Sequence, residues 1–223
     1  MSVFFLRRLA PLLRPHGKEA FLGSLLPGAH LLDVGCGNNS PARAKICAPG
    51  IRYTGLDIGD YNQQSDSIQA ADEYLITTPA QFAATIEGLA GRFDAVVSSH
   101  NLEHCDEPAR VLKAICAALK SGGRMYLSFP SEASTHLPRR PRNTLNFFDD
   151  PTHTVPPRLA DVLQGLRTAG FKVNFVAPRY RPPLPLLAGV VLEPLSLLSR
   201  RAMPFGTTWA LYGFETVLWA SRH

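Results

Sequence analysis

The segment His30–Ser40, HLLDVGCGNNS, constrains the fold more than any other stretch of this chain. Its apolar residues lead directly into the turn Gly35-Cys36-Gly37, and Ser40-Pro41 follows at once. This pattern predicts a buried strand over 30–34, a tight turn, and a helix over about 41–48 with Ser40 as its N-cap. Glycines let the backbone turn sharply and approach a ligand, and a helix N-terminus offers unpaired N–H groups. The segment therefore predicts an α/β fold with a ligand site at the turn.

The spacing of this turn departs from the G-x-G-x-x-G dinucleotide fingerprint. Gly35 and Gly37 match the first two positions, but Ser40 stands where the third glycine would allow close helix–strand packing. The chain also contains no Tyr-x-x-x-Lys pair. An NAD-dependent reductase is therefore the less favoured reading of this turn.

The rest of the chain alternates strand and helix patterns. Apolar and β-branched runs predict further strands over 51–58, 71–78, 93–98 and 124–129, and amphipathic patterns predict helices over 80–89 and 157–169. Asp106 is the expected cap of another helix, which Gly122-Gly123 would end. Segments 171–177 and 208–220 read as a final antiparallel pair. We expect a Rossmann-like, doubly wound, mainly parallel seven-stranded sheet with this C-terminal hairpin, in one domain over 1–223 with lead-in helices in 1–29.

Two stretches of this chain resemble a known family. Asp-Val-Gly-Cys-Gly at 33–37 resembles motif I of the class I S-adenosylmethionine (SAM) methyltransferases. Residues 93–130 resemble the second half of that domain, with Leu-Glu-His after the fourth strand and Lys-x-Gly-Gly before the fifth. The resemblance covers about 28–130 and is closest to the methyltransferase type 11-like family. It implies SAM as cofactor, held by Asp33, Gly35, Cys36, Gly37, Asp57, Ile58, His100 and Asn101.

Asp57 carries a further argument of its own. It ends the predicted second strand about 20 residues past the glycine turn, where an acidic side chain accepts hydrogen bonds from ribose hydroxyls. Ile58 beside it would lie against the adenine ring.

Methyl transfer from SAM needs an aligned acceptor and, for many acceptors, a base that removes one proton. His104 is the expected base, because the ordinary pKa of histidine lies near 6.5. His153 is the second candidate. The alternative is that these histidines only shape their loops. His100, Glu103 and His104 would share one face of a helical turn and form an alternative divalent-metal site, but we expect no catalytic metal.

The long segment 131–157 is rich in proline and arginine and is the expected active-site loop. Arg139, Arg140 and Arg142 would hold a phosphate or carboxylate of the acceptor, or else form a solvated basic loop. The expected acceptor is an oxygen or nitrogen atom of a small molecule or glycan precursor. A non-catalytic SAM- or nucleotide-binding protein is the alternative.

The insertion 178–206 is apolar and interrupted by prolines. We expect a cap over the acceptor pocket. A peripheral membrane contact through 184–198 is the alternative, because this greasy stretch is flanked by Arg179, Arg181, Arg200 and Arg201.

Charge and cysteine content exclude several classes of protein. A net charge of +5 suits an acidic acceptor or an anionic surface without singling out nucleic acid, and we expect no nucleic-acid partner. Four cysteines without C-x-x-C spacing predict reduced thiols and a cytoplasmic protein. Arginines interrupt the apolar N-terminus, so we expect no signal peptide, and no apolar run reaches the 18–20 residues or so that span a bilayer.

Overall fold

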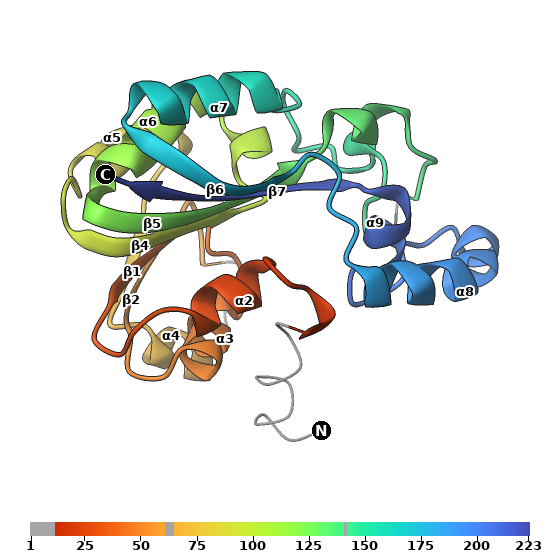
Figure 1. Ribbon diagram of the computed structural model, residues 1–223, viewed down its shortest axis with the longest axis horizontal. Helices are drawn as coiled ribbons and strands as arrows, with labels where there is room; N and C mark the ends of the chain where they lie inside the picture. Colours follow the sequence, from red (N-terminus) through yellow and green to blue (C-terminus); the bar gives the residue numbers. More distant parts are fainter. Residues whose placement is uncertain (1–11, 61–64, 141) are drawn as a thin grey trace.

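Seven strands form one sheet in the computed structural model, which describes residues 12–60, 65–140 and 142–223 (Figure 1). The sheet order is β3-β2-β1-β4-β5-β7-β6, and β7 runs antiparallel to both of its neighbours. The predicted mainly parallel sheet with a C-terminal antiparallel pair is therefore confirmed. The strands are β1 (His30–Val34), β2 (Arg52–Asp57), β3 (Glu73–Ile76), β4 (Phe93–Ser99), β5 (Leu119–Pro130), β6 (Phe171–Ala177) and β7 (Glu215–Arg222).

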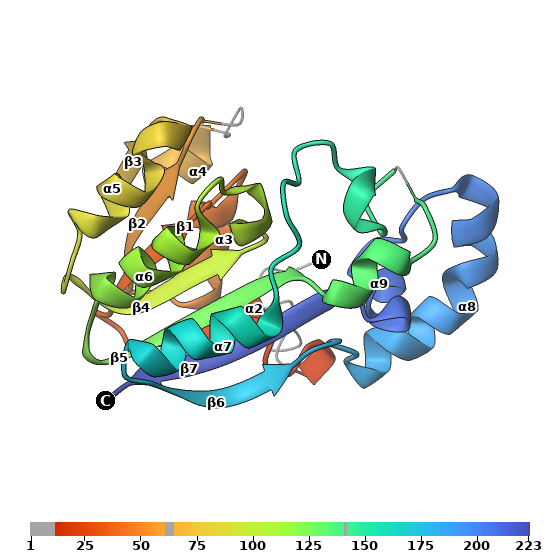
Figure 2. The same cartoon turned by 90° about the horizontal axis from the view of Figure 1, so that it is seen from above.

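Helices cover both faces of the sheet (Figures 1 and 2). One face carries α2 (Lys18–Gly23), α3 (Ser40–Cys47) and α4 (Ser65–Ala70), and the other carries α5 (Phe82–Glu87), α6 (Pro108–Ala118) and α7 (Leu159–Thr168). The remaining pair, α8 (Pro183–Ser199) and α9 (Thr207–Tyr212), packs together beyond one end of the sheet. Short 3-10 turns are η1 (Pro79–Gln81), η2 (Leu102–His104), η3 (Glu132–His136) and η4 (Phe147–Asp149).

The central strands are buried on both faces, as continuous apolar runs in parallel sheets require. Leu32 and Val96 face the core under α5, α6 and α7, whereas Leu31 and Val97 face the core under α2 and α3. Because the same strands contribute to both cores, the sheet is a rigid support for the loops at its edges.

Two helix boundaries differ from the predictions. The N-cap of α3 is Asn39, in the left-handed region at φ 60°, and Ser40 is already helical. The N-cap of α6 is Glu107, one residue after the predicted Asp106. That helix ends at Ala118 instead of at Gly122-Gly123, because Leu119 is extended, fully buried and paired with Phe93 at the start of β5. Burial of Leu119 therefore overrides the glycine stop signal.

Other differences concern the short elements. The predicted strand over 71–78 contracts to Glu73–Ile76, and α4 was not predicted. The first part of 208–220 belongs to α9, which ends where Gly213 adopts φ +62°, and only then does β7 begin. Of the predicted lead-in helices in 1–29, α2 is present, and residues 1–11 lie outside the described residues.

The register of the sheet brings three strand ends to one place. Val34, the last residue of β1, pairs with Leu56 of β2 on one side and with Ser98 of β4 on the other. The loops that follow these strands therefore share the carboxyl edge of the sheet, where ligands bind in open α/β folds.

Candidate active site

A cavity of about 480 Å³ opens at the carboxyl edge of the sheet. Its walls come from the glycine turn, the end of β2, the segment after β4, η1 with α5, and the 131–157 loop. The predicted site residues that line it are Gly35, Gly37, Asp57, Ile58, His100, Asn101 and His104. The fold therefore gathers these residues, from Gly35 to His104, around one hollow.

The glycine turn has the geometry that its sequence predicts. Gly35 adopts φ +69°, and a Cβ placed there would lie 2.4 Å from the Asn101 side-chain oxygen, so no other residue fits. Gly37 adopts φ +58°, and among the described atoms none lies within 4 Å of a Cβ built there. The first glycine therefore serves packing, and the second leaves the cavity open to a ligand.

Asp57 holds this turn from the end of β2. One carboxylate oxygen accepts a hydrogen bond from the Gly37 backbone N–H at 2.7 Å, and the other accepts from the Ile58 N–H at 2.8 Å. The Cys36 side chain also hydrogen-bonds Asp57. Because a carboxylate has about four lone-pair sites, Asp57 still keeps acceptor capacity for hydroxyls in the cavity. Burial raises the pKa of Asp57 above its ordinary value, against the two backbone hydrogen bonds, which lower it.

The side chains of Asp33 and Cys36 lie behind the turn, outside the lining of the cavity. The fully buried Asp33 carboxylate accepts from Lys18 Nζ at 3.1 Å and from the Tyr53 hydroxyl at 3.0 Å. The Cys36 thiol lies against Gly55 of β2, and burial raises its pKa to about 12. Neither side chain is among the described residues that line the cavity. Their contact with the cofactor stays a prediction.

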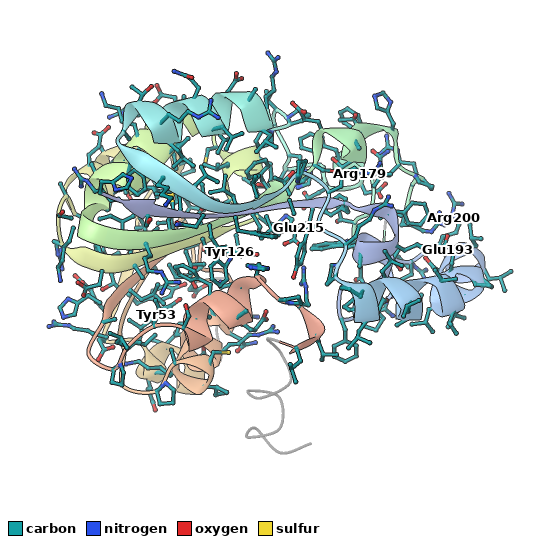
Figure 3. All side chains as sticks on the ribbon, in the orientation of Figure 1. Tyr53, Tyr126, Arg179, Glu193, Arg200 and Glu215 are labelled. Carbon is teal, nitrogen blue, oxygen red and sulfur yellow. The ribbon has the colours of Figure 1, made fainter. Side chains whose placement is uncertain are left out.

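His100 belongs to a buried ionic cluster beneath the cavity. Its Nδ1 donates to Glu103 at 3.0 Å and its Nε2 donates to Glu215 at 3.3 Å, while Arg14 forms an ion pair with Glu215 at 2.5 Å. Burial opposes protonation, but the hydrogen bonds and charges of Glu103 and Glu215 raise the pKa of His100 to about 10. Figure 3 shows Glu215 at the start of β7, between the sheet and α9.

This cluster fixes the state of His100. Two carboxylates face one imidazolium and one guanidinium, so the cluster is electrically balanced without a bound ion. Since both ring nitrogens of His100 already donate, His100 is neither a base nor a metal ligand. The alternative metal site of His100, Glu103 and His104 therefore lacks its first ligand.

His104 lies at the cavity rim with its ring oriented by the 131–157 loop. The Thr152 hydroxyl donates to Asp150 at 2.6 Å, and His104 Nδ1 lies 3.0 Å from the same hydroxyl oxygen. Because a hydroxyl carries one proton, His104 Nδ1 must be the donor in the second contact. The neutral ring then carries its lone pair on Nε2, the arrangement that a general base needs.

His153 lies beside His104, with ring centroids 4.8 Å apart. His153 Nδ1 donates to the Phe147 carbonyl at 2.6 Å, and its Nε2 lies 3.9 Å from an Asp150 carboxylate oxygen. One nitrogen of each histidine and one Glu103 oxygen lie within 4.8 Å of one another. Glu103 is fully buried, and its Oε2 has no hydrogen-bond partner within the described parts of the chain. These three side chains form a donor set that suits a divalent metal.

Sequence reasoning missed part of the wall. Pro79, Ala80, Phe82 and Ala83 line the cavity from η1 and α5. The signal was the Thr-Pro pair at 78–79, which marks a helix start after the third strand. Thr152 was also missed, since its role depends on a contact with His104 across 48 positions.

The predicted anion-binding arginines are largely committed within the protein. Arg139 pairs with Asp149 at 3.5 Å, and the buried Arg140 pairs with Glu193 of α8 at 3.0 Å. Arg142 remains exposed. No residue of α8 is among the described residues that line the cavity, so this helix contacts the loop rather than the pocket.

The family model for the methyltransferase domain matches residues 5–174. The ubiquinone biosynthesis O-methyltransferase of Xanthomonas campestris pv. campestris (strain B100) is 33% identical over 112 residues, 46% of this chain. The chain matches only 44% of that relative's length.

Solved structures share the fold along most of the chain. The S-adenosylmethionine-dependent methyltransferase from Mesorhizobium loti aligns with a TM-score of 0.61 at 16% identity, covering 99% of this chain and 100% of its own. The 1,6-didemethyltoxoflavin-N1-methyltransferase of Burkholderia thailandensis, solved with 1,6-didemethyltoxoflavin and S-adenosylhomocysteine, aligns with a TM-score of 0.58 at 18% identity, covering 94% and 77%. The chain therefore belongs to the methyltransferase domain family, within the class I SAM-dependent methyltransferases.

Proposed function

We propose that this protein transfers the methyl group of SAM to an oxygen or nitrogen atom of a small molecule or glycan precursor bound in the 480 Å³ cavity. The observation that supports this proposal most is that one cavity is lined both by residues suited to bind SAM and by a candidate base for the acceptor. The glycine turn and Asp57 lie on one wall, and His104 lies on another.

The cofactor half of the site is supported by the turn and its neighbours. The Gly37 backbone and the remaining lone pairs of Asp57 would receive the amino-acid and ribose ends of SAM, and the exposed Ile58 would contact the adenine ring. SAM, when bound, supplies a methyl group on a positively charged sulfur. Asn101 and the His100 cluster would then form the floor of the site.

The acceptor half depends on His104. Its Nε2 would take the proton that the acceptor oxygen or nitrogen loses as that atom attacks the methyl carbon. The hydrogen bond from Nδ1 to Thr152 would orient the ring throughout. Thr152 in turn is held by Asp150, so the 131–157 loop would position the base from the side of the cavity that these two residues line.

A divalent metal ion is a second means of preparing the acceptor, and the unpartnered Glu103 Oε2 favours it. Glu103, His104 and His153 would hold the ion, which would lower the pKa of a bound acceptor hydroxyl. Chelation separates the two possibilities. A base alone keeps its activity in chelator, whereas a metal site loses activity and regains it when a divalent ion is returned.

The names of the relatives indicate which acceptor atoms related proteins use. Those of the Xanthomonas type are named O-methyltransferases of ubiquinone biosynthesis, which favours oxygen, and the Burkholderia structure contains a small nitrogen heterocycle. The alternative is a protein that binds SAM without catalysis, because the fold alone does not fix the chemistry.

The test is transfer of labelled methyl from SAM to a panel of phenols, amines and sugar derivatives, with wild type and His104→Ala. We expect His104→Ala to reduce turnover by about a hundredfold or more while SAM affinity is kept. His136→Ala is the matched control, since His136 is exposed on the same loop outside the cavity. Equal turnover in all three proteins would refute the role of His104, and no transfer to any acceptor would favour the non-catalytic alternative.

A further inference from the structure

Helix α8 presents its polar and apolar residues in the reverse of the usual order. The inward face, packed against α9, carries Pro185, Gly189 and Ser196 as its buried residues. A Cβ on Gly189 would lie 2.3 Å from the Thr207 carbonyl oxygen, so this glycine allows the two helices to touch. Surface helices normally turn small and polar residues outward. Here the protein interior receives them instead.

The only acidic residue of α8 also belongs to the inward side. Glu193 accepts hydrogen bonds from Arg140 at 3.0 Å and from the Tyr212 hydroxyl at 2.6 Å. Figure 3 shows Glu193 on α8 with Arg200 near it at the far end of the helix. Since its charge is paired within the protein, Glu193 leaves no acidic group on the outer side of α8.

The outer side of α8 is a continuous apolar stripe. Leu184, Leu187, Val191, Leu195 and Leu198 follow one another at steps of three and four residues, which places them on one helix face. Leu187 is 60% exposed, Val191 77% and Leu198 86%. Phe205, just beyond the helix, is 84% exposed. Apolar side chains gathered in this way mark an interaction surface.

Arginines follow the stripe at its C-terminal end. Arg200 and Arg201 come directly after α8 and are exposed. Arg179 and Arg181, which precede α8, donate instead to the Tyr212 carbonyl at the end of α9. An interfacial helix has this arrangement, with an apolar face for the acyl boundary and cations for anionic headgroups. Within the described residues, no helix is long and apolar enough to cross a membrane.

We propose that α8 docks this protein onto an anionic lipid surface, with the Leu187–Val191–Leu198 stripe in the acyl boundary and Arg200 and Arg201 at the headgroups. The site is separate from the cavity and does not depend on the proposed function. Charge complementarity selects lipid over a second copy of the chain, because a second copy would bring its own arginines, and no acidic group, to the paired stripes.

The surface lies at the same sheet edge as the cavity. Helix α9, on which α8 packs, leads into β7, whose first residue Glu215 pairs with Pro130 at the carboxyl end of β5. Docking through α8 would therefore hold the cavity end of the molecule toward the membrane.

The experiment is co-sedimentation of the full chain with vesicles of phosphatidylglycerol and phosphatidylcholine, and with vesicles of phosphatidylcholine alone. We expect wild type to bind the anionic vesicles preferentially and in a salt-sensitive way. The double variant Leu187→Glu/Val191→Glu should reduce binding by about tenfold or more, since two apolar contacts are lost. Its matched control is Leu26→Glu, because Leu26 is 76% exposed outside α8.

A second pair of variants tests the charge. Arg200→Gln/Arg201→Gln should weaken binding to anionic vesicles severalfold and flatten its salt dependence. Arg158→Gln/Arg167→Gln, at the exposed N-cap and in the last turn of α7, should change neither. Circular dichroism should show all variants folded, because the substituted side chains are exposed. The proposal is overturned if wild type binds both vesicle types equally or not at all, or if Leu26→Glu matches the α8 variant. A dimer in solution that the α8 variant dissolves, without vesicle binding, would assign the face to a second copy.

Discussion

His100 lies where the sequence predicted it, but its ionic partners could not be predicted from the sequence. It follows β4 at the predicted edge of the sheet and lines the cavity. Its partner Glu215 pairs in turn with Arg14, at the opposite end of the chain, and no local spacing connects either residue to position 100. The state of its ring could therefore be read only from the folded structure.

The raised pKa of His100 predicts a stability change with pH. A histidine whose pKa rises from 6.5 to about 10 on folding contributes stability that is complete below pH 6.5 and is lost as the pH rises through about 10. Glu215, whose pKa falls from 4.5 to about 2, contributes stability above pH 4.5 that is lost only toward pH 2. Between pH 4.5 and 6.5 both contributions are present.

We therefore expect the free energy of unfolding, measured by urea denaturation, to fall as the pH rises from 6.5 to about 9. His100→Gln should lower it by about 3 kcal/mol at pH 6.5, since the variant leaves buried carboxylates without their cation, and should remove most of the slope. His136→Gln, at an exposed position, should behave as wild type. A slope that is unchanged in His100→Gln would contradict a protonated His100 in the folded state.

At the scale of elements, the packing of α8 against α9 depends on the close approach of Gly189 to the Thr207 backbone. Gly189→Ala would place a methyl group against the Thr207 backbone carbonyl, which cannot move without displacing α9. In Gly165→Ala, the matched change in α7, the new Cβ meets only the Leu112 side chain at 3.0 Å, and a leucine can rotate.

We expect Gly189→Ala to destabilise the protein by about 2 kcal/mol, the usual cost of overpacking, and Gly165→Ala to cost less. Amide hydrogen exchange should increase over α8 and α9 in Gly189→Ala and stay unchanged in β1 and β4, because these strands pack in the two cores of the sheet and not against α8 and α9. Equal exchange over α8 in both variants would show that the close approach does not hold this pair together.

Elements differ in how far the sequence predicted them. Strands β1, β2 and β4 were predicted almost to the residue, because continuous apolar runs between turn residues leave little choice. The N-caps Ser40 and Asp106 were each wrong by one position, since several residues near a helix start can adopt cap geometry. The end of α6 was wrong because burial of Leu119 outweighs local propensity.

At the scale of the whole molecule, the site is an assembly of strand ends that the sheet brings together. Gly35, Gly37 and Asp57 could be predicted, because a turn with φ above zero and an acid at a strand end have local signatures. The Thr152–His104 contact and the α5 wall could not, since both depend on how the 131–157 loop and α5 fold over that edge. The predicted cap over the pocket by 178–206 stays a prediction, and α8 contacts the loop instead.

The most direct test of the proposed function is the affinity for SAM, measured by isothermal titration with wild type, Asp57→Ala and Asp72→Ala. Asp72 is the matched control, because it also lies beside β2 but pairs with Lys45 at 2.6 Å outside the cavity. We expect wild type to bind one SAM and no NADH, Asp57→Ala to lose about 1–3 kcal/mol of binding free energy, and Asp72→Ala to bind as wild type. If wild type does not bind SAM, or if Asp57→Ala binds SAM with unchanged affinity, there is no SAM site of the proposed kind at this edge of the sheet.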